Sequence, residues 1–299
     1  MMSLISLLPR FARRAVRRAM LAYGRRLNVQ GMLAVSKKSA IRACLRAASK
    51  SAAYRQLLEE CGVDPARLDS TTDLSRLPVL TKANTFERFA LHELCISMPV
   101  GDLADVLTSS GRSGQGSRSF GFKLTSRRQH RDAWFDMDLG LQDVFGVDEK
   151  PTLLVNCLPM GVTFQSRAVT VANVSVREDM ACTILRDVGP RFEQTLVCAD
   201  PLFIRRILDE ARVAGVDWPS LNTSLILGEE VLVESQRDFL ASRMGIDIDR
   251  DAHRLIGSSF GLGELGLNLL FETRETIGLR RAMRGDGSLQ SLLCGSRLF

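Results

Sequence analysis

Residues 195–227, TLVCADPLFIRRILDEARVAGVDWPSLNTSLIL, decide the fold. The stretch begins and ends with short apolar segments, Thr195–Ala199 and Ser224–Leu227, whose length and composition are typical of buried strands. Between them apolar side chains recur at helical spacing, with Pro201 where a helix can begin and Gly215 where it can end. A strand, a helix and a second strand in this order predict one unit of a layered α/β sheet.

The same alternation continues on both sides of this stretch. Three further short apolar segments predict strands: Thr152–Leu158, Ala181–Leu185 and Leu255–Ile256. Residues 233–244 have the spacing of a helix, and residues 168–180 fit either structure. The predicted fold class is therefore α/β, with a layered sheet flanked by helices.

The sequence before this sheet predicts mainly helices. Residues 36–61 follow a helical pattern, and Gly62 supplies a stop. Residues 84–87 and residues 126–129 each match a pattern typical of a helix start. The second of these predicts a long helix that continues to about Phe145.

The composition is that of a globular protein with a sizeable core. The chain has 299 residues, of which 45% are hydrophobic and 25% charged, and this excludes intrinsic disorder. The longest uncharged run, residues 151–166, has 16 residues, fewer than the roughly 20 that a membrane-spanning helix needs. Seven scattered cysteines without a CxxC pair argue against a disulfide framework, so we expect a reducing, cytoplasmic location. With three histidines in the chain, no zinc site is expected.

The net charge of +6 is distributed unevenly along the chain. Residues 1–58 contain 13 of the 40 Lys and Arg residues and no acid, which leaves 27 bases and all 34 acids for the rest. We therefore predict two parts, a basic helical N-terminal segment over residues 1–58 and an α/β domain over residues 59–299.

A helix over residues 10–26 would have a basic face and an apolar face. The basic face holds Arg10, Arg13, Arg14, Arg17 and Arg18, and the apolar face holds Phe11, Ala15, Ala19, Met20 and Tyr23. Such a helix can bind an anionic membrane surface, which would place the protein at the inner membrane periphery. Alternatively, the apolar face packs on the body of the protein and the arginines are solvated, which is the arrangement we favour. The composition also matches an organelle transit peptide. Nucleic-acid binding is not expected, because the basic face of this helix carries no aromatic residues and no reading motif is present.

Two motif matches near the end of the chain do not predict the usual chemistry. Residues 257–261 match GxSxG, with Ser259 as nucleophile, but all three histidines precede Ser259, whereas in that fold the histidine follows the serine. Residues 261–266 match GxGxxG. In a dinucleotide-binding domain this motif follows the first strand, and most of the sheet comes after it in the sequence. Only 33 residues follow Gly266, which is too few.

The Gly/Ser-rich stretch Thr108–Arg118, TSSGRSGQGSR, is the better candidate for a binding site. Consecutive small residues let backbone N–H groups turn toward an anion, and the hydroxyls of Ser109, Ser110 and Ser113 add donors. The stretch therefore predicts a phosphate-binding loop, with a plain flexible connector as the alternative.

Four segments between about residues 53 and 273 are informative together. They are Ala53–Asp64 (AYRQLLEECGVD) with Leu77–Lys82 (LPVLTK), Ser109–Gln115 (SSGRSGQ), Leu227–Val231 (LGEEV) and Phe260–Glu264 (FGLGE). In sequence and in order they resemble the motifs of the adenylate-forming superfamily, in the branch of phenylacetate–CoA ligases and of the acyl-protein synthetases of bacterial luminescence.

The resemblance implies that a small carboxylic acid is activated by ATP as an acyl- or aryl-adenylate, with Mg²⁺, and passed to a thiol of CoA or of a carrier protein. It assigns ATP phosphate binding to Ser109, Ser110, Gly111, Ser113 and Gly114. It assigns the adenine and carboxylate pocket to Gly228, Glu229 and Glu230, adenine stacking to Phe260 beside Gly261, and Mg²⁺ binding to Glu264. The acid pocket is expected to draw on residues 158–166.

The sequence also departs from the family pattern. Arg112 stands where Thr is usual, Gly116 where Pro is common, and Gly263 where a hydroxyl residue would touch the α-phosphate. The family's ribose-binding Asp, its hinge and the Lys of its small C-terminal domain lie well beyond the Glu segment, and 35 residues follow Glu264 here. No catalytic residue is therefore assigned, and we expect the large N-terminal domain alone. It would be a truncated product of such a ligase, or work with a separately encoded C-terminal domain, or be a non-catalytic remnant that binds a nucleotide or a partner.

Overall fold

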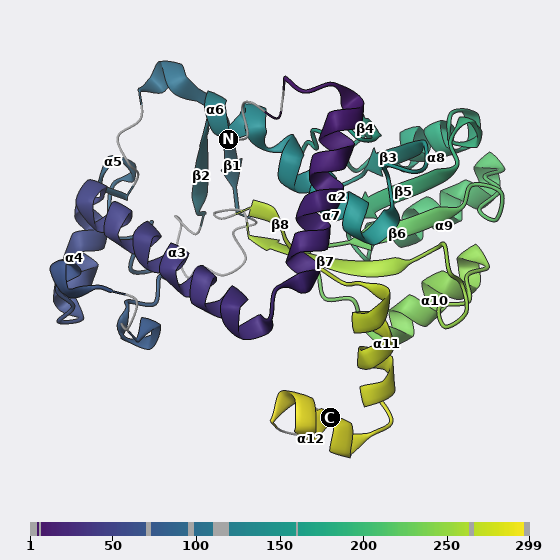
Figure 1. Ribbon diagram of the computed structural model, residues 1–299. Coiled ribbons are helices and arrows are strands. Elements are labelled where there is room, and N and C mark those ends of the chain that lie inside the picture. Colours follow the sequence, from purple (N-terminus) through teal and green to yellow (C-terminus); the bar gives the residue numbers. More distant parts are fainter. Residues whose placement is uncertain are drawn as a thin grey trace. The chain divides into compact units, whose positions relative to one another are not determined.

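The computed structural model describes residues 5, 7–69, 73–94, 99–109, 120–159, 161–262 and 266–295 (Figure 1). The chain forms two compact units. The N-terminal unit lies within Ser3–Asp132, and the C-terminal unit comprises Ala133–Leu262 and Gly266–Phe299.

The C-terminal unit is built on a six-stranded sheet with the order β4-β3-β5-β6-β7-β8. The strands are β3 (Thr152–Asn156), β4 (Thr170–Asn173), β5 (Gln194–Ala199), β6 (Thr223–Leu227), β7 (Ile256–Leu262) and β8 (Gly266–Phe271). Strands β4, β3, β5, β6 and β7 are mutually parallel, and β8 pairs antiparallel to β7. The predicted α/β fold class is confirmed.

Helices connect and flank these strands. They are α7 (Trp134–Phe145) before the sheet, α8 (Glu178–Asp187), α9 (Phe203–Ala214) and α10 (Glu234–Met244) between strands, and α11 (Arg274–Met283) and α12 (Gly287–Cys294) after it. Helix α9 begins just after Pro201 and ends at Gly215, which takes the left-handed conformation with φ +74°, so both predicted boundaries are confirmed.

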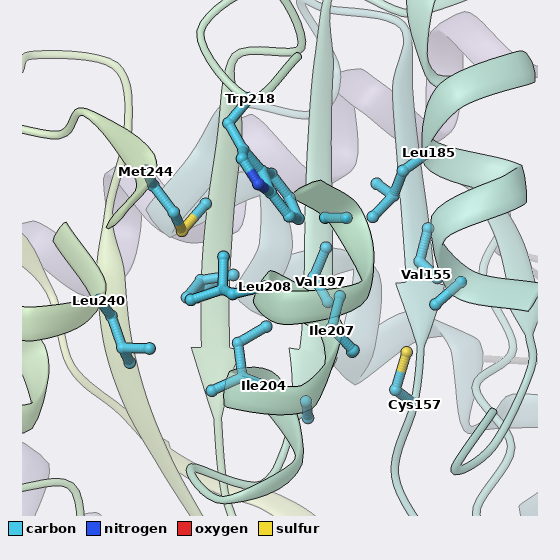
Figure 2. Close-up of a cluster of buried hydrophobic side chains, with 14 of the residues drawn as sticks. Val155, Cys157, Leu185, Val197, Ile204, Ile207, Leu208, Trp218, Leu240 and Met244 are labelled. Atoms are coloured by element: carbon cyan, nitrogen blue, oxygen red, sulfur yellow. The ribbon is translucent and has the colours of Figure 1, made fainter. Parts of the chain in front are cut away.

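The core lies between the sheet and the three connecting helices (Figure 2). Val155 of β3 and Val197 of β5 pack in one cluster with Ile204, Ile207 and Leu208 of α9. Every residue of β3, β5 and β6 is buried, which is typical of central parallel strands covered on both faces.

The predicted strand Ala181–Leu185 is wrong, because these residues lie inside α8. Ala181, Cys182 and Leu185 are buried at helical spacing, and a short apolar run does not distinguish a buried helix turn from a strand. The ambiguous residues 168–180 contain β4 and the start of α8. The predictions also missed β8 and the two helices that follow it.

The N-terminal unit is mainly helical. Its elements are α2 (Arg10–Arg26), α3 (Val29–Lys50), α4 (Ala52–Glu60), the 3₁₀ turns η1 (Pro65–Arg67), η2 (Leu74–Arg76) and η3 (Val100–Asp102), α5 (Leu91–Leu94), β1 (Leu103–Thr108), β2 (Phe122–Ser126) and α6 (Arg127–Asp132). Strands β1 and β2 pair antiparallel. In the part of the chain that the structure describes, no helix combines the length and the apolar character needed to cross a bilayer.

Two predicted helices in this region are each divided in the structure. The helix predicted over residues 36–61 is two helices, because the Ser51 hydroxyl accepts a hydrogen bond from the backbone N–H of Tyr54 (3.2 Å) and starts α4 there. The predicted cap at residues 126–129 is confirmed, since Gln129 Oε1 accepts from the backbone N–H of Ser126 (2.9 Å). The long helix that it starts is interrupted at Ala133, which separates α6 from α7.

The helix predicted to start at residues 84–87 is wrong. Residues 82–88 form consecutive turns, and the short α5 begins later, at Leu91. Asn84 Oδ1 accepts from the backbone N–H of Thr81 (2.8 Å), and its amide donates to Val79 O (2.9 Å). The side chain thus stabilises a turn in competition with a helix.

The predicted helix over residues 10–26 is confirmed as α2. The whole predicted apolar face is exposed, with Phe11 at 75% and Tyr23 at 66% of their full accessible surface. Arg17, on the predicted basic face, is buried at 2% exposure. Sequence spacing identifies the two faces of a helix but not which of them is covered.

Candidate functional site

The carboxyl ends of the parallel strands place several chain segments at one edge of the sheet. The strand register aligns Asn156 with Cys198, Ala199 with Leu227, and Leu227 with Ser258. After β3 the chain passes to β4 on one side, and after β5 it passes to β6 on the other side. In open α/β sheets, ligands bind beyond the carboxyl ends of the strands where the connections diverge in this way.

Two of the predicted nucleotide segments meet at this edge. Gly228 follows β6 directly, and a Cβ added to it would lie 2.9 Å from Ser259 Oγ on β7. The backbone N–H of Gly228 donates to Ala199 O (3.1 Å), which fixes the residue against β5 as well. A residue with a side chain would therefore be crowded at position 228, and glycine fits. Gly228 thus lies next to the segment that contains Phe260.

Glu229 has an unusual backbone conformation. Its φ is +73°, in the left-handed region that residues other than glycine rarely adopt. Such strained positions cost about 1 kcal/mol or more and concentrate at binding and catalytic sites. Glu229 is exposed and Glu230 half-buried, so both carboxylates lie at the surface of this edge.

Phe260 is exposed near the end of β7. The residue belongs to β7, directly after Ser259, and pairs with Leu270 of β8. It is 54% exposed, whereas the strand begins with the buried Ile256. An aromatic ring in this position offers a flat apolar face on which a base can stack, and Gly261 beside it is half-buried.

A buried charge network packs against the first half of β7 and the end of β8. Arg237 of α10 is fully buried and donates to Glu272 Oε2 (2.7 Å), Glu234 Oε1 (3.1 Å) and the carbonyl of Ile256. Glu272 Oε2 also accepts from the backbone N–H of Ser258 (2.7 Å). The network therefore connects α10 with β7 and with the segment after β8.

The network also sets the protonation of Glu272. Burial by itself raises the pKa of Glu272, but the hydrogen bond and charge of Arg237, with the Ser258 N–H, lower it below the ordinary value. Sequence analysis missed these residues. The spacing of Glu234 and Arg237 is visible in the sequence, but Glu272 is 35 residues from Arg237.

A small apolar cavity lies beneath the edge. Its volume is about 20 Å³, and its lining residues are Met137, Leu158, Phe164, Cys198, Ile226, Ser259 and Phe271. That volume is close to the space of one water molecule. Leu158 and Phe164 come from the connection between β3 and β4, where the sequence predicted the acid pocket.

Hydrogen bonds hold the first half of this connection. Asn156 is buried at the end of β3, and its Nδ2 donates to Val162 O (2.7 Å) and to Asn173 Oδ1 (2.8 Å). Asn173 Oδ1 also accepts from the backbone N–H of Phe164 (3.2 Å). The two asparagines thus fix the backbone that carries Phe164.

The second half of the connection is held by α7. Asp138 is completely buried, and its Oδ1 accepts from the Ser166 hydroxyl (2.5 Å) while its Oδ2 accepts from the Arg167 backbone N–H (3.1 Å). The Arg167 guanidinium lies 4.5 Å from the ring centre of Trp134. Sequence analysis did not single out Asn156 or Asp138, because their partners are fixed by the tertiary structure.

The predicted phosphate loop belongs to the N-terminal unit, where the structure describes its two ends. Ser109 follows β1, and its hydroxyl accepts from the backbone N–H of Gly121 (2.8 Å), while its own N–H donates to Gly121 O (3.0 Å). These bonds close the base of the loop between β1 and β2. The other predicted residues of the loop (Ser110, Gly111, Ser113 and Gly114), together with Glu264, lie outside the described residues.

A larger hollow of about 280 Å³ lies elsewhere in the C-terminal unit, between the loop before β7 and α11. It borders Ile256, the first residue of β7, and so lies at the opposite edge of the sheet from Gly228. Its arginines are engaged by neighbouring acids: Arg254 pairs with Asp251 and Arg281 with Asp249. None of the predicted site residues lines this hollow, so its size alone does not make it the functional site.

No protein-family model matches the sequence, and no curated protein is similar to it at a significant level. The fold does match solved structures of 2-hydroxyisobutyryl-CoA ligase. The ligase in an open conformation with 2-HIB-AMP and CoA has a TM-score of 0.58 and 16% identity, over 79% of this chain and 55% of the ligase chain.

Two other states of the same ligase agree with this match. The ligase in the thioesterification state with 2-HIB-AMP and CoA gives a TM-score of 0.58 at 15% identity. In the postadenylation state with 2-HIB-AMP the values are 0.57 and 15%, and both matches cover 81% of this chain and 52% of the ligase chain. The chain thus spans about half the length of the ligase that it matches, and over that length its α/β fold is similar to that of 2-hydroxyisobutyryl-CoA ligase.

Proposed function

We propose that the chain forms the nucleotide- and acid-binding part of a ligase that activates a carboxylic acid with ATP and passes the acyl group to a thiol. The observation that carries the proposal is the close approach of Gly228, which precedes Glu229 and Glu230, to Ser259, which precedes Phe260, at the carboxyl edge of the sheet. The fold match to a ligase crystallised with an acyl-AMP adds support.

In this proposal the two segments bind the adenine end of ATP. The exposed ring of Phe260 stacks on the base, and the segment after Gly228 forms the neighbouring wall of the pocket. The loop from Ser109 to Gly114 binds the β- and γ-phosphates through backbone N–H groups and hydroxyls. The hydrogen bonds that close the base of this loop at Ser109 are consistent with that role.

The proposed metal is Mg²⁺, held by Glu264. Magnesium in ATP sites is commonly bound by one or two carboxylates together with substrate phosphates, so a single protein carboxylate is chemically adequate. When bound, the ion neutralises charge on the phosphates. The described part of the chain holds no cluster of three or more metal-binding side chains, and the assignment rests on the sequence motif.

The reaction proceeds in two displacements. A carboxylate oxygen of the acid attacks the α-phosphorus of ATP, the bond to the bridging oxygen breaks, and pyrophosphate leaves. The thiol sulfur of CoA or of a carrier protein then attacks the acyl carbon, and AMP leaves. The attack on phosphorus needs alignment and stabilisation of negative charge, which backbone N–H groups and a cation supply.

The acid is proposed to lie between this edge and the connection that carries Phe164. The cavity there is apolar and holds about one water, so an acyl or aryl group would enter as Phe164 moves or would lie above it. Apolar lining favours an acid with a hydrocarbon or aromatic body. A separately encoded C-terminal domain or a carrier protein is the proposed partner for thiol transfer.

ATP binding, measured by calorimetry, tests the nucleotide site. Phe260→Ala should weaken ATP binding about 5- to 150-fold, because stacking of a base on an aromatic ring contributes about 1–3 kcal/mol. Phe239→Ala is the matched control, since Phe239 is also exposed but lies on α10. Gly111→Val should abolish binding if residues 109–114 cradle the phosphates, because its Cβ would occupy the space that the phosphate approaches.

ATP–pyrophosphate exchange with a panel of aliphatic and aromatic acids tests the chemistry. Exchange with any acid supports activation as an adenylate and identifies the substrate class. ATP binding without exchange favours the alternative, a non-catalytic nucleotide-binding remnant. A folded protein that does not bind ATP contradicts both.

A further inference from the structure

We propose that helix α2 and the start of α3 form a docking surface for an anionic lipid bilayer, a property separate from the ligase chemistry. The surface consists of the exposed face of α2 around Phe11 and Tyr23 and of the exposed first turns of α3 around Val29 and Leu33. It is called the α2–α3 surface below.

The exposed face of α2 is continuous. Phe11, Ala15 and Ala22 follow one another at spacings of four and seven residues and so lie on one line along the helix. Ala19 and Tyr23 lie to one side of this line, and all five side chains are exposed. The exposed Arg18 also lies on the line, between Ala15 and Ala22, so the face has small residues in the middle, an aromatic ring toward each end and a basic side chain among them.

The first turns of α3 continue the apolar surface in sequence. Val29, Met32 and Leu33 are three and four residues apart, which places them on one side of the helix, and all are exposed. A cluster of apolar side chains in water is unfavourable unless it is covered in use.

Charge identifies what covers it. Arg10 and Arg26 are exposed at the two ends of α2, and Arg18 is exposed between them. The first 58 residues contain no acid. A protein partner usually presents both signs of charge, whereas an anionic bilayer presents a uniform negative surface that requires no acid in return. Aromatic rings and long basic side chains on one exposed helix face are also the residue types that locate at the lipid headgroup level.

The contact is peripheral. A helix of this kind lies in the plane of the interface, with its apolar side chains at the boundary between headgroups and acyl chains and its basic side chains among the lipid phosphates. Each base near such a surface contributes about 1 kcal/mol, or about a fivefold change in affinity, at moderate salt.

Sedimentation with vesicles tests the proposal, using the whole chain. We expect the protein to sediment with vesicles of equal parts phosphatidylcholine and phosphatidylserine, and not with vesicles of phosphatidylcholine alone. Arg10→Glu with Arg26→Glu should reduce vesicle binding at least about 25-fold, since two bases are lost. Phe11→Ser with Tyr23→Ser should also reduce it, without changing net charge.

The matched control is Arg191→Glu with Arg212→Glu, which reverses two exposed arginines of the C-terminal unit. This control has the same net charge as Arg10→Glu with Arg26→Glu and should bind vesicles like the intact protein. Circular dichroism confirms that each variant is folded. Equal binding by the two charge-reversed proteins would overturn the proposal, because net charge and not the α2–α3 surface would then govern association. Failure of the intact protein to sediment with anionic vesicles at low salt would overturn it as well and would indicate a protein as the occupant.

Discussion

The central sheet of the C-terminal unit and the α2–α3 surface of the N-terminal unit use apolar side chains in opposite ways. Every residue of β3 and β5 is buried, including the polar ones. On α2 and α3, Phe11, Tyr23 and Val29 are largely exposed. The two regions have similar apolar side chains but differ in what covers them.

This difference indicates which region stabilises the fold and which is available to bind a partner. Parallel strands are covered on both faces by the helices that connect them, so apolar residues in the sheet contribute to the core. A helix with an uncovered apolar face contributes little to the core but is available for a partner. Both tryptophans, Trp134 and Trp218, lie in the C-terminal unit, so their fluorescence reports the unfolding of that unit.

The largest effect is expected at Arg237. Arg237→Ala should lower the free energy of unfolding of the C-terminal unit by about 3–5 kcal/mol, because it removes the fully buried cation of the network and leaves Glu234 and Glu272 paired only with the half-buried Arg280 and Arg281. Urea unfolding followed by tryptophan fluorescence measures the loss. Arg177→Ala is the control, since it breaks only the exposed pair with Asp179 and should cost about 0–1 kcal/mol. Similar losses in the two variants would contradict the central role of the network.

A core truncation sharpens the comparison between the two regions. Ile207→Ala should cost the C-terminal unit about 2–5 kcal/mol, because Ile207 is fully buried and its removal leaves a cavity beside the sheet. Val35→Ala on α3 removes the same kind of side chain where it is 67% exposed, and should change stability by about 0.5 kcal/mol or less. Urea unfolding of both variants checks the expectation. A loss at Val35 as large as that at Ile207 would show that α3 is packed as tightly as the sheet.

Acid should weaken the C-terminal unit through Glu272. Because its pKa is lowered in the folded protein, the carboxylate contributes stability that is complete above the ordinary value of 4.5 and is lost as the pH falls through the lower folded value. Thermal unfolding from neutral pH to about pH 3 should therefore show a falling Tm below about pH 4.5. Glu272→Gln should be less stable at neutral pH and should show a shallower acid decline. An unchanged decline in Glu272→Gln would assign the acid sensitivity to other carboxylates.

The smallest effect is expected at the start of α3. Asn28 Oδ1 accepts from the backbone N–H of Gly31 (2.6 Å) and caps the helix. Asn28→Ala should cost about 1 kcal/mol, confined to α3, because one backbone donor of the first turn loses its partner. Hydrogen exchange should become faster in the first turns of α3, while the tryptophan-detected unfolding of the C-terminal unit stays the same. A matching loss in the C-terminal unit would show that the two regions unfold together.

Much of the C-terminal fold could be predicted from the sequence, because its signals are local. Four of the predicted strands, those within residues 152–158, 195–199, 224–227 and 255–256, overlap observed strands, and α9 ends at the glycine that the sequence indicated. The segment Ala181–Leu185 could not be assigned, because five apolar residues fit either a strand or one side of a helix. Strand β8 escaped prediction, since it is defined by pairing with β7 and not by its own pattern.

The candidate site was predictable only in its parts. Gly228–Glu230 and Phe260–Gly261 stand out as segments of the sequence, but they are about 30 residues apart there, and the β6–β7 register alone brings Gly228 to Ser259. Asn156, Asp138 and Arg237 carry no sequence signal of comparable strength. Their importance comes from burial and from partners that lie elsewhere in the chain.

The sequence by itself determined the α/β class, the boundaries of α9 and α10, and the two faces of α2, because spacing and capping act over a few neighbouring residues. The tertiary structure alone decided that Gly228 lies against Ser259, that Arg237 is buried beside Glu272, and that the apolar face of α2 is the exposed one. These features depend on strand register and on which surfaces are covered. Contacts between distant segments set both, and the amino-acid pattern of a single segment does not contain them.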